Sequence, residues 1–344
     1  MVNAIISELE LRDGYINGEI DSIYFGGGTP SLISSNGIAD ILNKISKLYK
    51  VSSSAEITLE ANPEDIGKAK ATALKNLGVN RISLGIQSFD DKVLRGLNRV
   101  HTTAQGLNAI EILQNNGFEN ISVDLIYGIP GQSSSLWKAN LTEVVRLDIP
   151  HLSCYALTIE SKTVFGKWAV SGKFHSVTDD KYGQDYKLMC DYLASTGYEH
   201  YEVSSFAKPG FKSHHNSSYW LQEPYLGLGP AAHSYNGDSR QNNVSNNSQY
   251  IKAINIGELP NKTEILSDSQ KVNEYILTGL RTSNGIDFKR LKDEFEIDLL
   301  KTNKSFIQRC VNNKMANLND ARFILTDEAL ILADSIIIEL MIDE

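Results

Sequence analysis

The amino-acid sequence predicts an α/β fold, a partial barrel of the TIM type followed by a smaller, mostly helical C-terminal domain. From Asp21 to about Val203, short β-branched runs alternate with helical stretches, which is typical of repeated βα units. Gly78, Gly117 and Gly197 stand just past three of these helical stretches, where a left-handed helix C-cap favours glycine. Polar residues follow the predicted strands, and a parallel barrel gathers its functional groups at these strand ends.

Six strands and five helices are expected in the barrel. The strands are Ser22–Phe25, Glu56–Glu60, Arg81–Gly85, Ser122–Ile126, His151–Ala156 and Glu199–Val203. The helices lie around Asn36–Tyr49, Pro63–Leu77, Thr103–Asn115, Ser134–Leu147 and Asp179–Ser195. An open doubly wound sheet would gather its site at one switch point instead of spreading it over six strand ends. We therefore favour a partial (βα)6 barrel.

The chain divides into three parts. Its 344 residues exceed what a single core usually supports, which is roughly 250–300 residues. We expect the partial barrel over residues 1–205 and a connection rich in Asn, Ser, Gly and Tyr, and hence in irregular loops, over residues 206–261. Periodic Leu, Ile and Phe predict a mostly helical domain over residues 262–344, in which Arg322–Leu330 could add a short strand and a turn.

Composition excludes several classes of protein. The net charge of -9 argues against a general nucleic-acid binder, which needs clustered Lys and Arg. The first residues carry carboxylates where a signal peptide needs a basic start, and acidic residues interrupt the apolar C-terminal stretch before it could span a bilayer. The three cysteines, Cys154, Cys190 and Cys310, stand far apart, so we expect buried thiols in a cytoplasmic protein that is not integral to the membrane.

The strand ends carry the residues with useful chemistry. These are Gly26-Gly27-Gly28-Thr29-Pro30, then Glu60-Ala61-Asn62-Pro63, then Gln87-Ser88, Asp124 with Tyr127, Tyr155 and Glu202. The triple glycine lets backbone N–H and C=O groups approach a ligand, because no side chain blocks them. A tight connection from strand to helix would use the same residues, so the turn alone leaves both interpretations open.

Seven segments, in this order, resemble the HemW/HemN group of radical S-adenosylmethionine (SAM) proteins, and the resemblance covers nearly the whole chain. They are IYFGGGTPSL (23–32), TLEANPE (58–64), SLGIQSFD (83–90), VDLIYGIPGQ (123–132), YEVSSFAKPG (201–210), HNSSYW (215–220) and LGLGPAAHSY (226–235). In the last segment the family usually has glycine where this chain has Ala231. The glycines of that segment would let the chain turn closely beneath a cofactor.

The resemblance implies a SAM-binding site at the strand ends. The residues that match the family's SAM-lining positions are Gly27, Gly28, Thr29, Glu60, Gln87, Arg99, Asp124 and Ala156. A carboxylate such as Glu60 can accept two hydrogen bonds from a ribose. Other roles stay open at this stage, because Glu60 or Asp124 could cap a helix and Arg99 could be a solvated charge.

The segment His215-Asn216-Ser217-Ser218-Tyr219-Trp220 resembles the HNxxYW signature of the HemW heme chaperones. The resemblance implies heme binding by His215, Tyr219 and Trp220, since an imidazole next to aromatic faces suits a flat porphyrin with an axial ligand. His214 could be the ligand instead, and a capped loop whose aromatic rings fill the core is the structural alternative.

Family members hold a [4Fe–4S] cluster with a CxxxCxxC motif, which is absent here. The resemblance places Met1 at an internal position of the family, so we expect an N-terminally truncated chain that lacks the cluster loop and the first barrel strand. We do not expect such a chain to cleave SAM. An exposed strand edge would also make it prone to aggregation.

Three functions are carried forward. HNSSYW favours a heme chaperone that binds heme and transfers it to an acceptor protein, such as a membrane respiratory enzyme, with SAM and the cluster in the full-length form. The alternative is an oxygen-independent coproporphyrinogen III oxidase, which decarboxylates propionates in porphyrin biosynthesis. The missing cysteines alone support a third possibility, an inactive fragment without a cluster.

Overall fold

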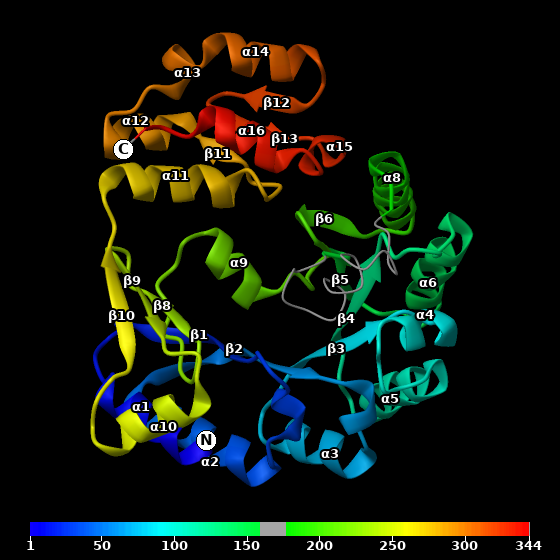
Figure 1. Cartoon of the computed structure of the whole chain (residues 1–344), viewed down its shortest axis with the longest axis vertical. Coiled ribbons are helices and arrows are strands. Elements are labelled where there is room, and N and C mark those ends of the chain that lie inside the picture. The colour runs from blue at the N-terminus through cyan, green and yellow to red at the C-terminus, as the bar shows by residue number, and fades with distance from the viewer. Residues whose placement is uncertain (159–176, 344) are drawn as a thin grey trace, which may run out of the picture.

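A curved seven-stranded sheet forms the centre of the molecule in the computed structural model, which describes residues 1–158 and 177–343 (Figure 1). The strand order is β1-β2-β3-β4-β5-β7-β6, and the first five strands are parallel. The strands are β1 (Glu19–Phe25), β2 (Lys50–Ala61), β3 (Arg81–Gln87), β4 (Asn120–Tyr127), β5 (His151–Ala156), β6 (Glu199–Glu202) and β7 (Ser205–Ala207).

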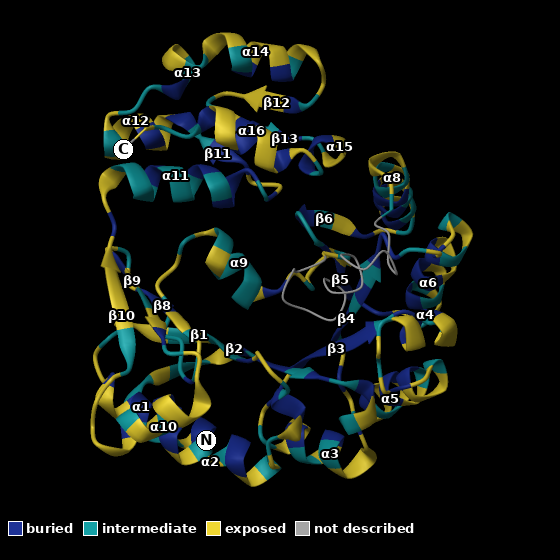
Figure 2. Ribbon diagram, in the orientation of Figure 1, coloured by how far each residue is buried: buried dark blue, intermediate teal, exposed yellow. Residues whose placement is uncertain are grey.

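Helices cover the outer face of this sheet, as Figure 1 shows. They are α2 (Ser35–Leu48), α3 (Lys68–Asn76), α4 (Asp91–Gly96), α5 (Thr103–Asn115), α6 (Ser134–Arg146) and α8 (Asp179–Ser195), with single 3₁₀ turns at η1 (Pro30–Leu32) and η2 (Pro63–Asp65). Hydroxyl side chains cap several of them; Ser34 accepts from Gly37 N, and Thr102 forms a capping box with Gln105. Each barrel helix buries one face and exposes the other (Figure 2).

The core lies between the sheet and these helices. Every second residue of β2, β3 and β4 points into it, so Leu59, Ile82 and Val123 are fully buried. The opposite, inner face of the same strands carries polar side chains. The predicted partial barrel with helices on its outside is therefore confirmed.

One strand departs from the predicted parallel order. β7 lies between β5 and β6 and is antiparallel to both. It is joined to β6 by only Val203 and Ser204, and an antiparallel pair can be closed by so short a connection. Phe206, expected at the start of the irregular connection, is instead a buried residue of this strand.

The connection after β7 is more ordered than the sequence predicted. It contains α9 (His214–Trp220), β8 (His233–Tyr235), β9 (Ser239–Asn243), α10 (Asn247–Asn255) and β10 (Asn261–Ile265), and the three strands form an antiparallel sheet. These strands are short and largely polar, so no apolar alternation identified them in the sequence. In Figure 1, α9 lies inside the space partly enclosed by the curved sheet, this second sheet and α11.

The C-terminal region is mostly helical, as predicted. Its helices are α11 (Asp268–Gly279), α12 (Phe288–Phe295), α13 (Leu299–Thr302), α14 (Lys304–Asn312), α15 (Asp327–Leu330) and α16 (Ala333–Leu340). A small sheet joins β11 (Ile286–Asp287), β13 (Arg322–Leu325) and β12 (Ala316–Asn319). The three-part division of the chain stays a prediction. Among the described residues, the structure has no helix with the length and apolar character that crossing a bilayer requires.

A buried polar network holds α1 (Val2–Leu11) against the second sheet. The Glu8 carboxylate is fully buried and pairs with Arg12 Nε at 2.8 Å. It also accepts hydrogen bonds from Asn243 Nδ2 at 2.7 Å, Gly229 N at 2.8 Å and Tyr250 Oη at 2.6 Å. A buried charge is tolerated only when it is paired and hydrogen-bonded, and here both conditions hold.

Replacing Glu8 should weaken the contact between α1 and the second sheet. In Glu8→Ala the Arg12 guanidinium stays buried without its counter-ion, so we expect the free energy of unfolding to fall by about 3–5 kcal/mol. Urea unfolding followed by circular dichroism measures this. Glu10→Ala, which removes an exposed carboxylate from the same helix, is the control and should cost at most about 1 kcal/mol. Equal losses in the two variants would contradict the role of the network.

Candidate functional site

Polar side chains line the inner face of the curved sheet. In β1 and β2, Ser22, Tyr24, Glu56 and Glu60 alternate with apolar residues that face the helices. Because successive side chains of a strand point to opposite faces, all of these groups lie on the concave side. The polar groups of β3, β4 and β5 continue the same lining.

One row of polar side chains on neighbouring strands crosses this face. Tyr24 Oη donates to Glu60 Oε1 at 2.8 Å, and Glu60 is the register neighbour of Ser83 on β3. Ser83 Oγ donates to Asp124 Oδ1 at 3.2 Å, and Asp124 is paired in register with Ser153 on β5. Two of the predicted SAM-site carboxylates, Glu60 and Asp124, therefore lie in one row across adjacent strands, and neither caps a helix.

The glycine turn approaches Glu60 from the end of β1. Gly27 N donates to Glu60 Oε2 at 3.0 Å. Gly27 and Gly28 have φ angles of 74° and 62°, which are in the left-handed region that glycine adopts without strain. A Cβ on Gly26 would lie 2.5 Å from Tyr24 Cε1, so a side chain there has no room. Thr29 precedes η1, and its backbone carbonyl accepts from Leu32 N at 3.1 Å.

A second cluster lies at the end of β3. Arg99 Nη2 donates to Asn62 Oδ1 at 2.7 Å and to the Gly85 carbonyl at 3.2 Å, so Arg99 is not a solvated charge. A Cβ on Gly85 would lie 2.9 Å from Gln87 Nε2 and 3.3 Å from Arg99 Nη2, which shows that both side chains lie over this glycine. Gln87 has a φ of 65°, an uncommon conformation for a residue other than glycine.

The last predicted position lies at the end of β5. Ala156 packs against the core between sheet and helices. Tyr155, one residue earlier, has its pKa raised by burial and then by the charge of Asp124, with Glu60 contributing further.

The Asp124 carboxyl is less acidic than an ordinary aspartate. Burial raises the pKa of Asp124 to about 6, while the Arg81 guanidinium and the hydrogen bond from Ser83 oppose this rise. The folded pKa exceeds the ordinary value of 3.8. The protonated carboxyl therefore favours the folded state, and this contribution is lost as the pH rises through the folded pKa.

Replacing Asp124 with a neutral isostere should remove this pH dependence. We expect Asp124→Asn to be more stable than the unmodified chain at pH 8 by about 3 kcal/mol, because the pKa of Asp124 is raised from 3.8 to about 6 and one pKa unit corresponds to about 1.4 kcal/mol. At pH 4, where the carboxyl is protonated, the two should differ little. Urea unfolding at both pH values measures this, with the exposed Asp40→Asn as control. A difference between Asp124→Asn and the unmodified chain that is the same at both pH values would contradict the assignment.

Helix α9 is anchored to the inner face by Glu56. The Glu56 carboxylate accepts hydrogen bonds from Ser213 Oγ at 3.2 Å, His214 N at 3.1 Å and His215 N at 3.0 Å. Arg81, which is almost fully buried, lies with its Nε 3.9 Å from Glu56 Oε2. The first turn of α9 is therefore held against β2, with an anion at the positive end of the helix.

This anchor places His215 on the concave side. Its ring stacks on Tyr24 with centroids 4.5 Å apart and planes 14° apart, and Tyr219 meets it edge-on at 4.9 Å. His215 Nδ1 lies 2.9 Å from Ser22 Oγ. Burial lowers the pKa of His215 to about 4, so the imidazole is neutral at pH 7.

His214 points elsewhere. It lines a groove of about 380 Å³ at the opposite, N-terminal ends of the strands, together with Lys75, Lys212 and Phe211. Within the motif, Tyr219 is exposed and stacks edge-on with Tyr225 at 4.5 Å, while Trp220 is half-buried at the end of α9. The sequence left open which of the two histidines would be the heme ligand, and the structure places them on different sides of α9. The motif forms a helix and not the loop that the alternative interpretation assumed.

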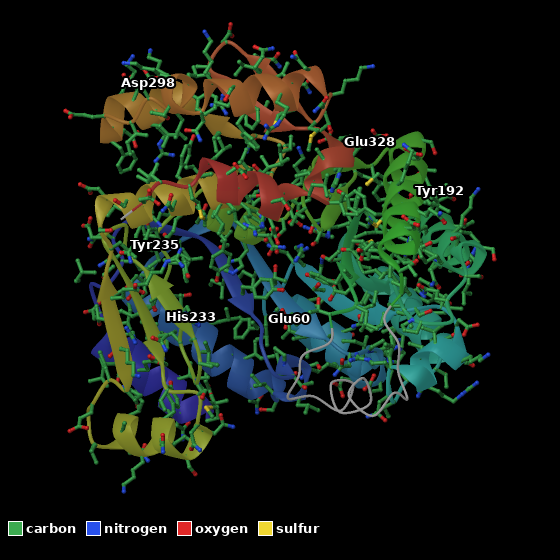
Figure 3. All side chains as sticks on the ribbon, turned by 45° about the horizontal axis from the view of Figure 1, so that its top comes forward. Glu60, Tyr192, His233, Tyr235, Asp298 and Glu328 are labelled. Atoms are coloured by element: carbon green, nitrogen blue, oxygen red, sulfur yellow. The ribbon has the colours of Figure 1, made fainter. Side chains whose placement is uncertain are left out.

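The segment after α9 is shaped by close backbone contacts. A Cβ on Gly227 would lie 1.9 Å from the His233 carbonyl oxygen, so glycine is required there. Ala231, where the resemblance leads one to expect glycine, has a φ of 59°, and this conformation explains that preference. Figure 3 shows His233 and Tyr235 on β8, away from Glu60.

The cysteines do not offer a cluster site. Cys154, Cys190 and Cys310 are free and buried, and burial raises the pKa of each thiol. Over residues 1–158 and 177–343, no group of three or more His, Cys, Asp or Glu side chains could hold a metal ion. These residues do not fit a [4Fe–4S] cluster.

Several residues of the site escaped the sequence analysis. Tyr24, Ser22, Glu56 and Arg81 organise the concave face, yet none of them is the last residue of a strand or follows one. The signal that could have found them is the period of two along β1 and β2, in which polar and apolar residues alternate.

Comparisons with known proteins agree with this architecture. Residues 3–139 match the Radical SAM superfamily, and residues 266–332 match the HemN C-terminal domain. The solved structure of coproporphyrinogen III oxidase (HemN) from Escherichia coli, a radical SAM enzyme, has a TM-score of 0.83 at 18% identity and covers 99% of this chain and 82% of that one. At this identity the likeness shows the fold alone.

Relatives are more similar in sequence. The heme chaperone HemW of Lactococcus lactis is 34% identical over 95% of this chain and 86% of its own length. HemW of Bacillus subtilis is 32% identical over 92% of this chain and 84% of its own length. A mitochondrial radical S-adenosyl methionine domain-containing protein of Danio rerio is 32% identical over 94% of this chain and 76% of its own length. On this evidence the chain belongs to the HemW family of the radical SAM superfamily.

Proposed function

We propose that this chain binds heme through His215, binds SAM at the strand ends, and passes the heme to an acceptor protein. The observation that carries the heme assignment is the placement of His215 by α9. Relatives named heme chaperones support it, because they match most of the chain. The acceptor is a protein that needs heme, and a membrane respiratory enzyme is one such class.

The chemistry of His215 suits an axial ligand of heme iron. When Nδ1–H donates to Ser22 Oγ, the lone pair remains on Nε2, which makes no hydrogen bond among the described residues. Metal-bound histidines commonly fix their tautomer in this way. The lowered pKa keeps this lone pair free of a proton at pH 7. The ring of Tyr219, exposed beside the imidazole, offers an apolar face to a porphyrin.

The strand ends suit the adenosyl part of SAM. Glu60 has four lone-pair positions, and the donors Tyr24 Oη and Gly27 N use two of them, so a ribose diol can occupy the others. The positive φ angles of Gly27 and Gly28 leave the turn without side chains to block a ligand. SAM in this superfamily supplies radical chemistry with a cluster, whose ligands this chain does not offer, so we propose binding only.

Replacing His215 should weaken heme binding. In His215→Ala the axial ligand is lost, and we expect the dissociation constant for heme to rise about ten-fold or more, since a metal–ligand bond is removed. Titration followed by the Soret band measures this. His214→Ala, which alters the neighbouring imidazole, should bind heme like the unmodified chain.

The outcomes separate the two histidines. A Soret titration unchanged in His215→Ala but weakened in His214→Ala would move the site to the groove with Lys75 and Lys212. A titration unchanged in both variants would contradict heme ligation by this motif. Circular dichroism of each variant establishes that it is folded.

Replacing Glu60 should weaken SAM binding. Glu60→Gln leaves one acceptor oxygen in place of two, and a hydrogen bond to a charged group contributes about 1.5–3 kcal/mol, so we expect binding weaker by about ten-fold or more. Isothermal titration calorimetry measures this. Glu111→Gln, at an exposed position on α5, is the matched control. Equal affinities in all three proteins would place the SAM site elsewhere.

A further inference from the structure

Tyr24 lies between the two proposed sites and contacts both. Its hydroxyl donates to Glu60 Oε1 at 2.8 Å, and its ring stacks on His215 with centroids 4.5 Å apart. Among the described residues, no other side chain contacts both groups. The proposed nucleoside site and the proposed heme site are therefore joined by a single side chain, Tyr24.

Tyr24 has little freedom to move. The backbone of Gly26 packs so closely that a Cβ there would lie 2.5 Å from the tyrosine ring. Burial, and after it the charge of Glu60, raises the pKa of Tyr24 far above its usual value, so the hydroxyl keeps its proton and remains a donor. The ring is thus held both at its edge and at its hydroxyl, with His215 stacked on its face.

His215 is held from two other sides. Ser22 Oγ bonds its Nδ1 at 2.9 Å, and Tyr219 meets its ring edge-on at 4.9 Å. Within the described part of the chain, neither Ser22 nor Tyr219 contacts Glu60. Of the three groups that orient the imidazole, Tyr24 is thus the one that also orients the carboxylate.

We propose that Tyr24 is a positioning residue shared by the two sites, through which a nucleoside bound at Glu60 tightens heme binding at His215. This inference rests on the proposed function, because it takes Glu60 as the nucleoside acceptor and His215 as the heme ligand. Neither the family matches nor the HNSSYW motif assigns a role to Tyr24.

The direction of the effect follows from the acceptor geometry of Glu60. A ribose diol takes the two free lone-pair positions of the carboxylate and leaves Tyr24 bound. Glu60 then becomes more ordered, and with it Tyr24 and the imidazole. A heme that binds next has less ordering entropy to overcome, which is positive cooperativity, and the coupling is reciprocal.

The test is a heme titration of the whole chain, with and without saturating S-adenosylhomocysteine, whose own binding is measured by calorimetry. We expect the nucleoside to lower the dissociation constant for heme about five-fold or more, the lower end of typical couplings between sites. Tyr24→Phe keeps the stacked ring and loses only the hydroxyl, so the ratio of the two constants should fall to about one. Tyr192→Phe, the same change on α8 and away from Glu60 in Figure 3, should keep the ratio of the unmodified chain.

A second readout does not depend on heme. In the ¹⁵N-histidine-labelled chain, S-adenosylhomocysteine should shift the imidazole resonances that disappear in His215→Ala, and it should not shift them in Tyr24→Phe. If heme does not bind but this shift is seen, the proposed heme function fails, while the link from Glu60 through Tyr24 to His215 stands. Heme binding that is indifferent to the nucleoside, or a coupling that survives in Tyr24→Phe, overturns the inference. Failure of the unmodified chain to bind S-adenosylhomocysteine overturns it as well.

Discussion

The carboxylate of Glu56 is the contact on which the arrangement of the site depends. It satisfies the first backbone N–H groups of α9 and faces the buried guanidinium of Arg81, so a helix from the connecting region is fixed to the wall of the barrel. An unpaired buried charge would cost free energy, so β2, β3 and α9 are held in one relative arrangement. Without this anchor, His215 would have no defined place relative to the strand ends.

The concave face has two polar layers, one at each end of the same strands. Towards their N-terminal ends, Glu56, Arg81 and His151 form a closed polar layer, in which His151 bonds Ser122 and Tyr201 at 2.7 and 2.8 Å. Towards the C-terminal ends, the row from Tyr24 to Asp124 keeps acceptor positions open. The first layer fixes α9 and the second can receive a ligand. This agrees with the general pattern of parallel barrels, whose N-terminal face serves stability and whose C-terminal face carries function.

Much of the fold followed from local signals. The β-branched runs and the glycines after helices located five parallel strands and the helices between them, because period and capping are properties of short segments. β7 was missed because it pairs through a two-residue connection that has no glycine, and β8 to β10 because their strands are short and polar. Of the predicted site residues, Glu60 and Gln87 lie at the ends of β2 and β3, and Asp124 lies within β4. Arg99 follows α4 and reaches the end of β3 through the Gly85 carbonyl. Their role in binding SAM remains a prediction.

The sequence by itself determined the βα repeat, the family and the motif that contains two adjacent histidines. Only the tertiary structure decided that His215 faces Tyr24 and Ser22 while His214 lines a groove at the other end of the strands. The physical reason is that adjacent residues of a helix point in different directions, and the direction each takes is set by where the helix is anchored. That anchor is a contact between Glu56 and residues more than 150 positions later in the chain, which no local pattern encodes.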